Sequence, residues 1–248
     1  MKKNVLITGG FKGIGKQISL EFLKNDYHVI ATSRFVDSQD QSSSLFAPYD
    51  KNVTFYQLDI TDEKQVKNTI NKIIARFGKL DVLINNAGIS LSNGLLSETE
   101  TSDFNKMINT NILGTYYCMK YALQHMIECS HGSIVNIASI TGLNGFPYSV
   151  LYGSTKHAII GLTKGAAIEF ADKDIKINAV APGIIKTETL QKEINSGEFT
   201  EDSISSIHPM QKLGTTLDVA KGVYFLANEN NSFITGHVLN IDGGYLSQ

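Results

Sequence analysis

Short apolar runs alternate with amphipathic stretches along the whole chain. The apolar runs are rich in Val and Ile and match buried strands in length; they lie at residues 4–8, 27–33, 53–58, 81–85, 133–138, 175–180 and 237–241. Helical periodicity predicts helices over residues 14–25, 63–77, 103–129, 152–171 and 217–227. Such alternation is typical of right-handed βαβ units. We therefore predict an α/β fold with a doubly wound, parallel, seven-stranded sheet and helices on both faces.

The pattern contains no linker rich in Pro or Ser and no internal repeat, so we expect residues 1–248 to form a single domain. Residues 38–44 are polar enough for a surface loop. The segment 187–213 breaks the alternation, because scattered apolar residues there suggest a pair of short amphipathic helices. It follows a predicted strand at the ligand-binding edge of the sheet, which fits either a mobile lid or a plain surface excursion.

The composition excludes several classes of function. Lys and Arg number 22 against 24 Asp and Glu, and the formal charge of -2 offers no basic surface for nucleic acid and no polybasic membrane anchor. The start, MKKNVLITGG, has too short an apolar run for a signal peptide or a spanning helix. Cys118 and Cys129 are the only cysteines. A reducing cytoplasmic compartment is therefore expected, with one bridge left open.

A glycine-rich sequence, TGGFKGIG at residues 8–15, joins the first predicted strand to the first predicted helix. Gly9 would permit a tight turn, Gly13 would let the backbone approach a pyrophosphate, and Gly15 would allow close packing of the helix. The free N–H groups of the helix would then bind the anion. The position of this motif predicts a dinucleotide site and a Rossmann-type sheet, while a glycine-rich turn without a ligand stays the alternative.

The end of the second predicted strand indicates which dinucleotide is bound. An acidic residue there would accept from the ribose 2′-OH of NAD, whereas arginine accommodates a 2′-phosphate. The chain has Ser33 and Arg34 at this point and no acid before Asp37, and Lys12 adds a positive charge in the glycine loop. We predict that NADP(H) is preferred over NAD(H), unless these two cations are merely solvated.

Tyr152 and Lys156 are spaced four apart in a predicted helix, so they share one face. A neighbouring ammonium would favour the phenolate and lower the pKa of the tyrosine from about 10, which suits a general acid/base. By itself the pair is also compatible with a solvated helix surface.

Taken together, these motifs resemble those of the single-domain short-chain dehydrogenases/reductases over nearly the whole chain. TGxxxGxG matches residues 8–15, NNAG matches residues 85–88, and Tyr-x-x-x-Lys matches Tyr152 and Lys156. The family's active-site Asn and Ser fall on Asn111 and Ser139. Its Pro-Gly turn and the following Thr fall on Pro182, Gly183 and Thr187.

The resemblance implies a role for each catalytic residue. Tyr152 would give a proton to a carbonyl oxygen as the hydride arrives, and Lys156 would lower its pKa and hold the nicotinamide ribose. Ser139 would bind the substrate oxygen. Asn111 would anchor a water that relays protons, with a kink in the helix as its alternative role. Asp59 would accept from the adenine amino group or merely cap the next helix.

The cofactor-binding residues that the resemblance implies are Gly9, Lys12, Gly13, Ile14, Gly15, Ser33, Arg34, Asp59, Ile60, Asn86, Ala87, Gly88, Tyr152, Lys156, Pro182, Gly183, Ile185 and Thr187. A small carbonyl or alcohol substrate would meet Ser139 and a mainly apolar set: Leu91, Leu143, Phe146 and Tyr148. No metal is expected, because the six histidines are scattered without paired-ligand spacing. Similar proteins are commonly tetramers, so a homotetramer or dimer is expected.

The chain is also similar to bacterial 3-oxoacyl-acyl-carrier-protein reductases, which makes an acyl thioester the alternative substrate. Those reductases carry two arginines for the acidic carrier, before the fifth and sixth strands. This chain has Ser133 at the first place and Lys173 near the second. Binding of an acyl carrier protein is therefore open to question. A different class, a dinucleotide-binding regulator without catalysis, is disfavoured because Ser139, Tyr152 and Lys156 are all present.

Overall fold

The computed structural model describes residues 2–35, 45–91, 94–197 and 200–248. Across these residues the main sheet is parallel and seven-stranded, in the order β3-β2-β1-β4-β5-β6-β9. Its strands are β1 (Asn4–Thr8), β2 (His28–Ser33), β3 (Val53–Gln57), β4 (Val82–Asn85), β5 (Gly132–Ile137), β6 (Ile175–Pro182) and β9 (Val238–Ile241). The predicted α/β sheet is therefore confirmed, and each bound agrees to within two residues. The polar loop expected at residues 38–44 lies outside the described residues.

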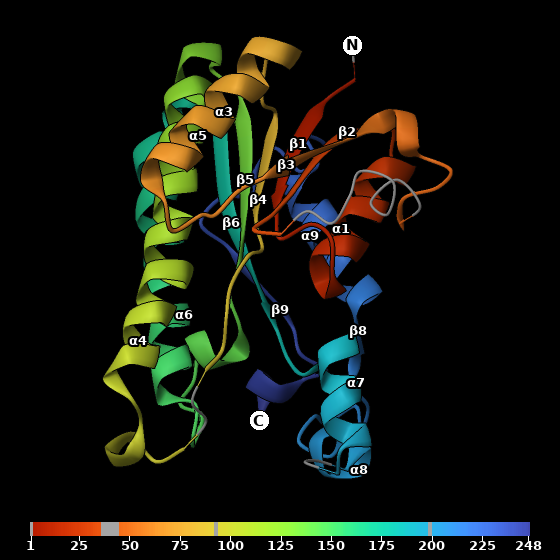
Figure 1. Ribbon diagram of the computed structural model, residues 1–248, viewed down its shortest axis with the longest axis vertical. Helices are drawn as coiled ribbons and strands as arrows, with labels where there is room; N and C mark the ends of the chain where they lie inside the picture. The colour runs from red at the N-terminus through yellow and green to blue at the C-terminus, as the bar shows by residue number, and fades with distance from the viewer. Residues whose placement is uncertain (1, 36–44, 92–93, 198–199) are drawn as a thin grey trace.

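Helices cover both faces of the sheet (Figure 1). On one face lie α1 (Gly13–Lys24) and α9 (Thr216–Ala227), which pack against each other. On the other lie α3 (Glu63–Phe77), α5 (Gly114–Cys129) and α6 (Val150–Phe170). Side chains of β1 alternate between the two cores: Val5 and Ile7 join the cluster under α1 and α9, and Leu6 joins the other. Burial on both faces explains why the strands lack polar alternation.

Helix α3 has the bounds that its sequence predicts because both ends carry clear signals. The Asp62 carboxylate accepts from the Gln65 amide at the first turn, and Gly78 follows the helix with a φ of 81°. Helix α9 begins one residue earlier than predicted, at a capping box between Thr215 and Asp218.

The helix predicted over residues 103–129 is instead three consecutive segments. Helix α4 (Thr101–Met107) runs into a π-helical segment, η3 (Ile108–Leu113), which continues as α5. Inserted π turns in α-helices are frequent at functional sites, because they redirect a side chain. This one contains Asn111, which is buried. The prediction of one uninterrupted α-helix is therefore wrong, and the interruption falls at the candidate catalytic residue Asn111.

The segment 187–213 contains two short helices, as predicted: α7 (Glu188–Asn195) and α8 (Glu201–Ser205). Thr187 and Thr200 cap them by accepting from the Leu190 and Ser203 amides. A small parallel pair that the apolar pattern does not reveal, β7 (Ile185–Lys186) with β8 (Gly214–Thr215), closes the base of this segment. Short 3-10 turns complete the described elements: η1 (Asp50–Asn52), η2 (Leu96–Glu98), η4 (Ile140–Gly142), η5 (Ala171–Lys173) and η6 (Tyr245–Ser247).

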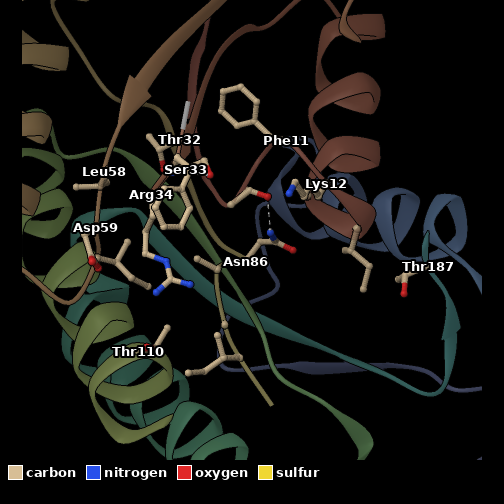
Figure 2. A pocket seen from close by; sticks show the side chains of 18 of the residues that line it. Phe11, Lys12, Thr32, Ser33, Arg34, Leu58, Asp59, Asn86, Thr110 and Thr187 are labelled. Atoms are coloured by element: carbon tan, nitrogen blue, oxygen red, sulfur yellow. Dashed lines mark hydrogen bonds between the residues drawn. The ribbon is translucent and has the colours of Figure 1, made fainter. Parts of the chain in front are cut away.

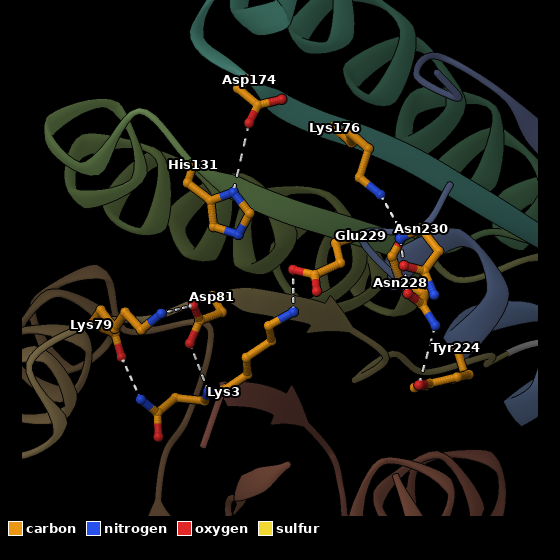
Figure 3. Close-up of polar contacts among 11 residues, drawn as sticks. Lys3, Lys79, Asp81, His131, Asp174, Lys176, Tyr224, Asn228, Glu229 and Asn230 are labelled. Atoms are coloured by element: carbon orange, nitrogen blue, oxygen red, sulfur yellow. Dashed lines mark hydrogen bonds and ion pairs between the residues drawn. The ribbon is translucent and has the colours of Figure 1, made fainter. Parts of the chain in front are cut away.

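Polar contacts join the strands at the edge opposite the glycine loop (Figure 3). The Asp81 carboxylate accepts from the Asn4 amide at 2.7 Å and pairs with the Lys79 ammonium at 2.6 Å. Lys3 pairs with Glu229. These contacts tie β1, β4 and the segment after α9 together. No helix within the described ranges is both long and apolar enough to cross a membrane.

Candidate active site

A cavity of about 780 Å³ opens at the carboxyl ends of β1, β2 and β4, where open α/β sheets bind ligands (Figure 2). This volume lies within the range of small-molecule and cofactor sites. Twelve of the predicted cofactor residues line it: Gly9, Lys12, Ile14, Gly15, Ser33, Arg34, Asp59, Ile60, Asn86, Ala87, Gly88 and Thr187.

Two glycines of the loop adopt backbone conformations that other residues avoid. Gly9 has a φ of 66° and Gly13 a φ of 49°. Gly15 is required for space instead, because a Cβ there would lie 2.1 Å from the Gly9 carbonyl oxygen. Helix α1 therefore starts directly against the loop, with its first amides at the cavity. Gly13 itself is not among the cavity-lining residues, although a Cβ there would lie 3.7 Å from the Thr187 methyl.

Asn86 holds the glycine loop in place. Its side-chain amide donates to the carbonyl oxygens of Thr8 and Gly9, at 2.9 and 3.1 Å. In return, the Thr8 hydroxyl accepts from the amides of Asn86 and Ala87, at 3.0 Å each. The NNAG and glycine motifs, nearly 80 residues apart, thus form one hydrogen-bonded wall of the cavity.

Arg34 stands at the end of β2 and directs its guanidinium into the cavity (Figure 2). The Gln57 side chain donates to the Arg34 carbonyl oxygen at 3.0 Å and thereby fixes its backbone. Lys12 lines the cavity from the glycine loop. Both cations therefore line the cavity in which the sequence predicts a ribose phosphate. Asp37, the first acid after them, lies outside the described residues.

Asp59 lines the cavity and also organises the turn that follows β3. One carboxylate oxygen accepts from the Thr61 amide at 2.9 Å and from its hydroxyl at 2.8 Å. The cap of α3 is Asp62, so the helix-capping alternative for Asp59 is wrong. An adenine contact by this side chain stays a prediction.

Tyr152 and Lys156 lie on the same side of α6, with the ammonium 5.4 Å from the centre of the tyrosine ring. The ammonium donates to the Ile137 carbonyl oxygen at 2.8 Å. Tyr152 hydrogen-bonds with Ser139, which follows β5. A Cβ on Gly142 would lie 2.8 Å from the Lys156 carbonyl, so η4 and α6 pack backbone to backbone. This contact brings Ser139 to Tyr152.

Burial sets the protonation of this pair in a way that the sequence did not predict. It raises the pKa of Tyr152 to about 12, because the charged phenolate is disfavoured there, while the hydrogen bond with Ser139 acts in the opposite direction. Burial likewise lowers the pKa of Lys156 to about 8. The expectation that the ammonium lowers the phenol pKa is therefore wrong for this structure. The phenol is a proton donor at neutral pH.

Asn111 is clamped between two backbone groups and α6. Its side-chain oxygen accepts from the Ile89 amide at 2.8 Å, and its nitrogen donates to the Ile89 carbonyl at 2.8 Å and to the Thr155 hydroxyl at 3.0 Å. A Cβ on Gly88 would lie 3.2 Å from the Asn111 oxygen and 3.7 Å from the Lys156 nitrogen. The π-helical segment thus places Asn111 beside Lys156 at the inner end of the cavity.

Besides Gly13, five predicted cofactor residues do not line this cavity. Pro182 ends β6 and pairs with Ile241 of β9, and Ile185 is buried in the core cluster of α1 and α9. Gly183 lines a second cavity of about 390 Å³, between the base of the 187–213 segment and the chain after β9. These residues support the turn that leads to Thr187. Tyr152 and Lys156 are also outside the cavity lining, although the Lys156 nitrogen lies next to Gly88, which is part of it.

None of the four predicted apolar substrate residues is among the residues that line the main cavity. Leu143 and Tyr148 are exposed, Leu91 and Phe146 are partly buried, and Tyr148 has a φ of 63°. The Tyr148 carbonyl accepts from the Gly94 amide at 3.0 Å, so the two loops that carry these residues are joined. Phe146 contacts the Tyr245 ring, at 6.1 Å between centres, which adds a residue that the sequence reading missed.

Seven further residues line the main cavity that the sequence reading did not select: Phe11, Thr32, Phe35, Leu45, Leu58, Ile89 and Thr110. Phe11 lies inside the glycine motif and packs on Phe55, at 5.0 Å between ring centres. Phe11 could have been predicted as a cavity residue because it lies between two glycines of the motif. Leu45 and Leu58 belong to no motif, so the sequence does not mark them as cavity residues. Among the described residues, no group of three or more His, Cys, Asp or Glu side chains is arranged to hold a metal ion.

Comparison with known proteins defines the class. A family model described as enoyl-(acyl carrier protein) reductase matches residues 9–246. The chain belongs to this family of short-chain dehydrogenases/reductases. It is 36% identical to 3-oxoacyl-[acyl-carrier-protein] reductase FabG of Thermotoga maritima, over 98% of this chain and 97% of that protein. It is 33% identical to 2,5-dichloro-2,5-cyclohexadiene-1,4-diol dehydrogenase of Sphingobium indicum, over 98% and 96%.

Among solved structures, the chain is similar to ElxO with NADP bound. The identity is 79%, the TM-score is 0.99 and both chains are covered completely. A second ElxO structure, with the substitution Y152F and NADPH bound, is 78% identical with the same TM-score and coverage. These likenesses confirm the family resemblance and the fold that the sequence indicated.

Proposed function

We propose that this protein transfers a hydride between NADP(H) and a ketone or secondary alcohol, with Tyr152 as the general acid/base. The observation that carries the proposal is that Tyr152, Ser139 and Lys156 lie together, with the Lys156 nitrogen next to Gly88, which lines the dinucleotide-sized cavity. The binding of NADP by ElxO, 79% identical over its full length, supports the choice of cofactor.

The residues that line the cavity fit a phosphorylated dinucleotide. The positive φ of Gly9 and Gly13 and the amides of α1 suit a pyrophosphate. Arg34 and Lys12 would hold the 2′-phosphate that distinguishes NADP(H) from NAD(H). The bound nicotinamide supplies or accepts the hydride, and the protein supplies placement and electrostatics.

Proton transfer falls to the chain's own side chains. Tyr152, which is protonated at neutral pH, would donate its phenolic proton to the substrate oxygen during reduction. Ser139, already hydrogen-bonded with Tyr152, would stabilise negative charge on the same oxygen. Lys156 would hold the nicotinamide ribose, and Asn111 would order a water between them. These roles give a reason for the proximity of Ser139, which follows β5, Tyr152 and Lys156 of α6, and Asn111 of the π-helical segment.

Replacement of Tyr152 by phenylalanine tests the proposal. Tyr152→Phe removes the proton donor and keeps the ring, so turnover of ketones with NADPH should fall at least about a hundredfold. Cofactor affinity, measured by fluorescence titration, should change by less than about twofold. Tyr224→Phe on α9, outside the cavity lining, is the control. Retained turnover in Tyr152→Phe rejects the assigned acid, and a wild type that binds NADPH without reducing any ketone favours the non-catalytic regulator.

A 3-oxoacyl thioester is the second candidate substrate, because the FabG relatives match the chain over nearly its full length. One feature weakens docking of a carrier: Ser133, at the place of one carrier-binding arginine, is buried in β5. Assays with acetoacetyl-carrier protein, acetoacetyl-CoA and small ketones separate these substrates. Turnover only of the substrate attached to the carrier protein would establish that the enzyme acts on a 3-oxoacyl thioester.

We further propose that residues 1–248 act as one cytoplasmic NADP(H)-binding domain with residues 187–213 as a substrate lid, assembled as a homotetramer or dimer. Apolar side chains exposed on α5, α6 and the segment before β9 support the assembly. Tyr116 is 40% exposed, Ile168 82% and Phe233 fully. Light scattering would show a mass above that of the 27.2 kDa chain, and a monomer at working concentration rejects the assembly.

A further inference from the structure

His208 occupies a junction between the end of the 187–213 segment, the turn after β6 and the chain after β9. The side chain is only 2% exposed. Its Nδ1 lies 2.6 Å from the Asp242 carbonyl oxygen, and its Nε2 lies 3.2 Å from the Ile184 amide nitrogen.

The two partners fix the state of the ring. A backbone carbonyl can only accept, so Nδ1 must carry a hydrogen and donate to Asp242. A backbone amide can only donate, so Nε2 must present its lone pair to Ile184. His208 is therefore a neutral imidazole of defined tautomer that satisfies two buried backbone groups. A second proton on the ring would set two N–H donors against each other.

The chain around His208 is shaped to receive it. A Cβ on Gly183 would lie 2.5 Å from His208 Cε1, so only glycine leaves room for the ring. The Met210 amide donates to the Gly243 carbonyl at 3.1 Å, and the Tyr245 ring stands edge-on to the imidazole at 6.0 Å. The histidine thus joins the lid base to the segment after β9 as well as to Ile184.

Ile184 is held on both sides by the same stretch of chain. His208 accepts from its amide, and the Gly214 amide donates to its carbonyl at 3.0 Å. Three residues further along, Thr187 caps α7 and lines the main cavity. The position of the cavity wall at Thr187 therefore depends on how firmly Ile184 is anchored.

We propose that His208 is a positioning residue for the reaction: through Ile184 it fixes the 184–187 wall of the cofactor cavity, and through Asp242 it anchors the lid base. The inference rests on the proposed function, in which Thr187, at the end of this stretch, belongs to the wall of the cofactor cavity. A displacement of about 1 Å at a reacting centre can lower a rate by roughly a hundredfold. His208 acts on the rate through Ile184, with no contact to the reacting atoms.

Two amide substitutions separate the contacts. His208→Gln can place its oxygen near the position of Nε2 and keep the acceptor for Ile184. His208→Asn can place its nitrogen near Nδ1 and keep the donor to Asp242. We expect His208→Asn to lower kcat for a ketone roughly tenfold or more while the Kd of NADPH changes less than about twofold. His208→Gln should keep kcat within about threefold of the wild type and raise KM, because the lid base loses its anchor.

Hydrogen exchange measured on the NADPH complex gives a readout that does not depend on turnover. The Ile184 amide should be protected in the wild type and in His208→Gln, and should exchange at least about tenfold faster in His208→Asn. His131→Gln, at the opposite edge of the sheet, is the matched control and should match the wild type in both measurements.

Equal kcat in the Asn and Gln variants, or an Ile184 amide unprotected in the wild type, would overturn the inference. A wild type that reduces no ketone counts against the proposed function alone, because the exchange pattern still reports the anchor. If either variant unfolds, hydrogen exchange of the Ile184 amide in the wild type is the remaining test: a protected amide supports the anchor, and an unprotected amide rejects it.

Discussion

Lys156 is the residue on which burial acts most directly. It is 5% exposed, and its ammonium donates to the Ile137 carbonyl. The charged form is disfavoured in such surroundings, which is why its pKa falls to about 8. The neutral lysine and the protonated Tyr152 are therefore the forms that the fold itself stabilises. A phenolate at Tyr152 or an ammonium at Lys156 therefore has to be stabilised by the ligand that binds next to them.

Stability should consequently depend on pH through Lys156. Its folded pKa is about 8 and its ordinary value 10.5, so between these values the unfolded chain binds one more proton and the free energy of unfolding rises with pH. Above pH 10 the raised pKa of Tyr152 opposes this, because the unfolded tyrosine loses its proton first. From pH 8 to 10 we expect a gain of roughly 2 kcal/mol, measured by urea denaturation without cofactor. Lys156→Met should lack this rise; an identical slope in both proteins would contradict the account.

Arg34 should decide between the two dinucleotides. Arg34→Asp replaces a phosphate-binding cation by a carboxylate that repels the 2′-phosphate and can accept from a 2′-OH. We expect the Kd of NADPH to rise by about tenfold or more and that of NADH to fall. Arg76→Asp, in the last turn of α3, controls for the change of charge. An unchanged preference would show that the guanidinium serves another purpose.

Among the elements, strands and capped helices follow from the sequence while local departures do not. Helix α3 is predictable because Asp62 and Gly78 mark its ends. The π-helical segment is not, because its residues INTNIL have no distinctive periodicity and the inserted turn depends on packing. For the same reason β7 and β8 escape prediction: two residues are too few for any alternation to be visible. Asn111 was nevertheless found, since the family motif marks it without geometry.

Contact between η4 and α6 offers a test at the level of elements. Gly142→Ala would put a methyl group 2.8 Å from the Lys156 carbonyl, and backbone atoms cannot move aside as a flexible side chain can. We expect a loss of about 1–3 kcal/mol in the free energy of unfolding, together with reduced turnover as Ser139 moves from Tyr152. Gly145→Ala, which meets nothing within 4 Å, is the control for stability. Equal denaturation midpoints for the two variants would refute this packing argument.

For the whole molecule, the fold class and most of the cofactor cavity could be predicted, because they follow from alternation and from residues in short motifs. The cavity walls formed by Phe35, Leu45 and Ile89 could not, since apolar residues near a motif look like core. The pKa of Tyr152 was misjudged for a related reason: helical spacing gives the distance to Lys156 and says nothing about how much protein surrounds both. Burial is a property of the complete fold.

The opposite edge of the sheet should contribute to global stability through Asp81. Its carboxylate is 1% exposed, accepts from Asn4 and pairs with Lys79. Asp81→Ala leaves the Asn4 amide without its partner, and we expect about 2–3 kcal/mol lower stability by chemical denaturation. Asp172→Ala, which breaks the exposed pair with Lys173, should cost less than about 1 kcal/mol. Comparable losses in the two variants would mean that the buried carboxylate has no special importance.

The junction at His208 has a consequence for the order in which the protein matures on the ribosome. Apart from Thr187, every residue that lines the main cavity precedes residue 111, so a nascent chain carries nearly the whole cofactor-binding wall early. The carbonyl that anchors His208 belongs to Asp242, which is synthesised after all of them. Nearly all of the cofactor-binding wall is thus synthesised well before the anchor of Thr187, and competence for hydride transfer arrives only as translation passes the last strand.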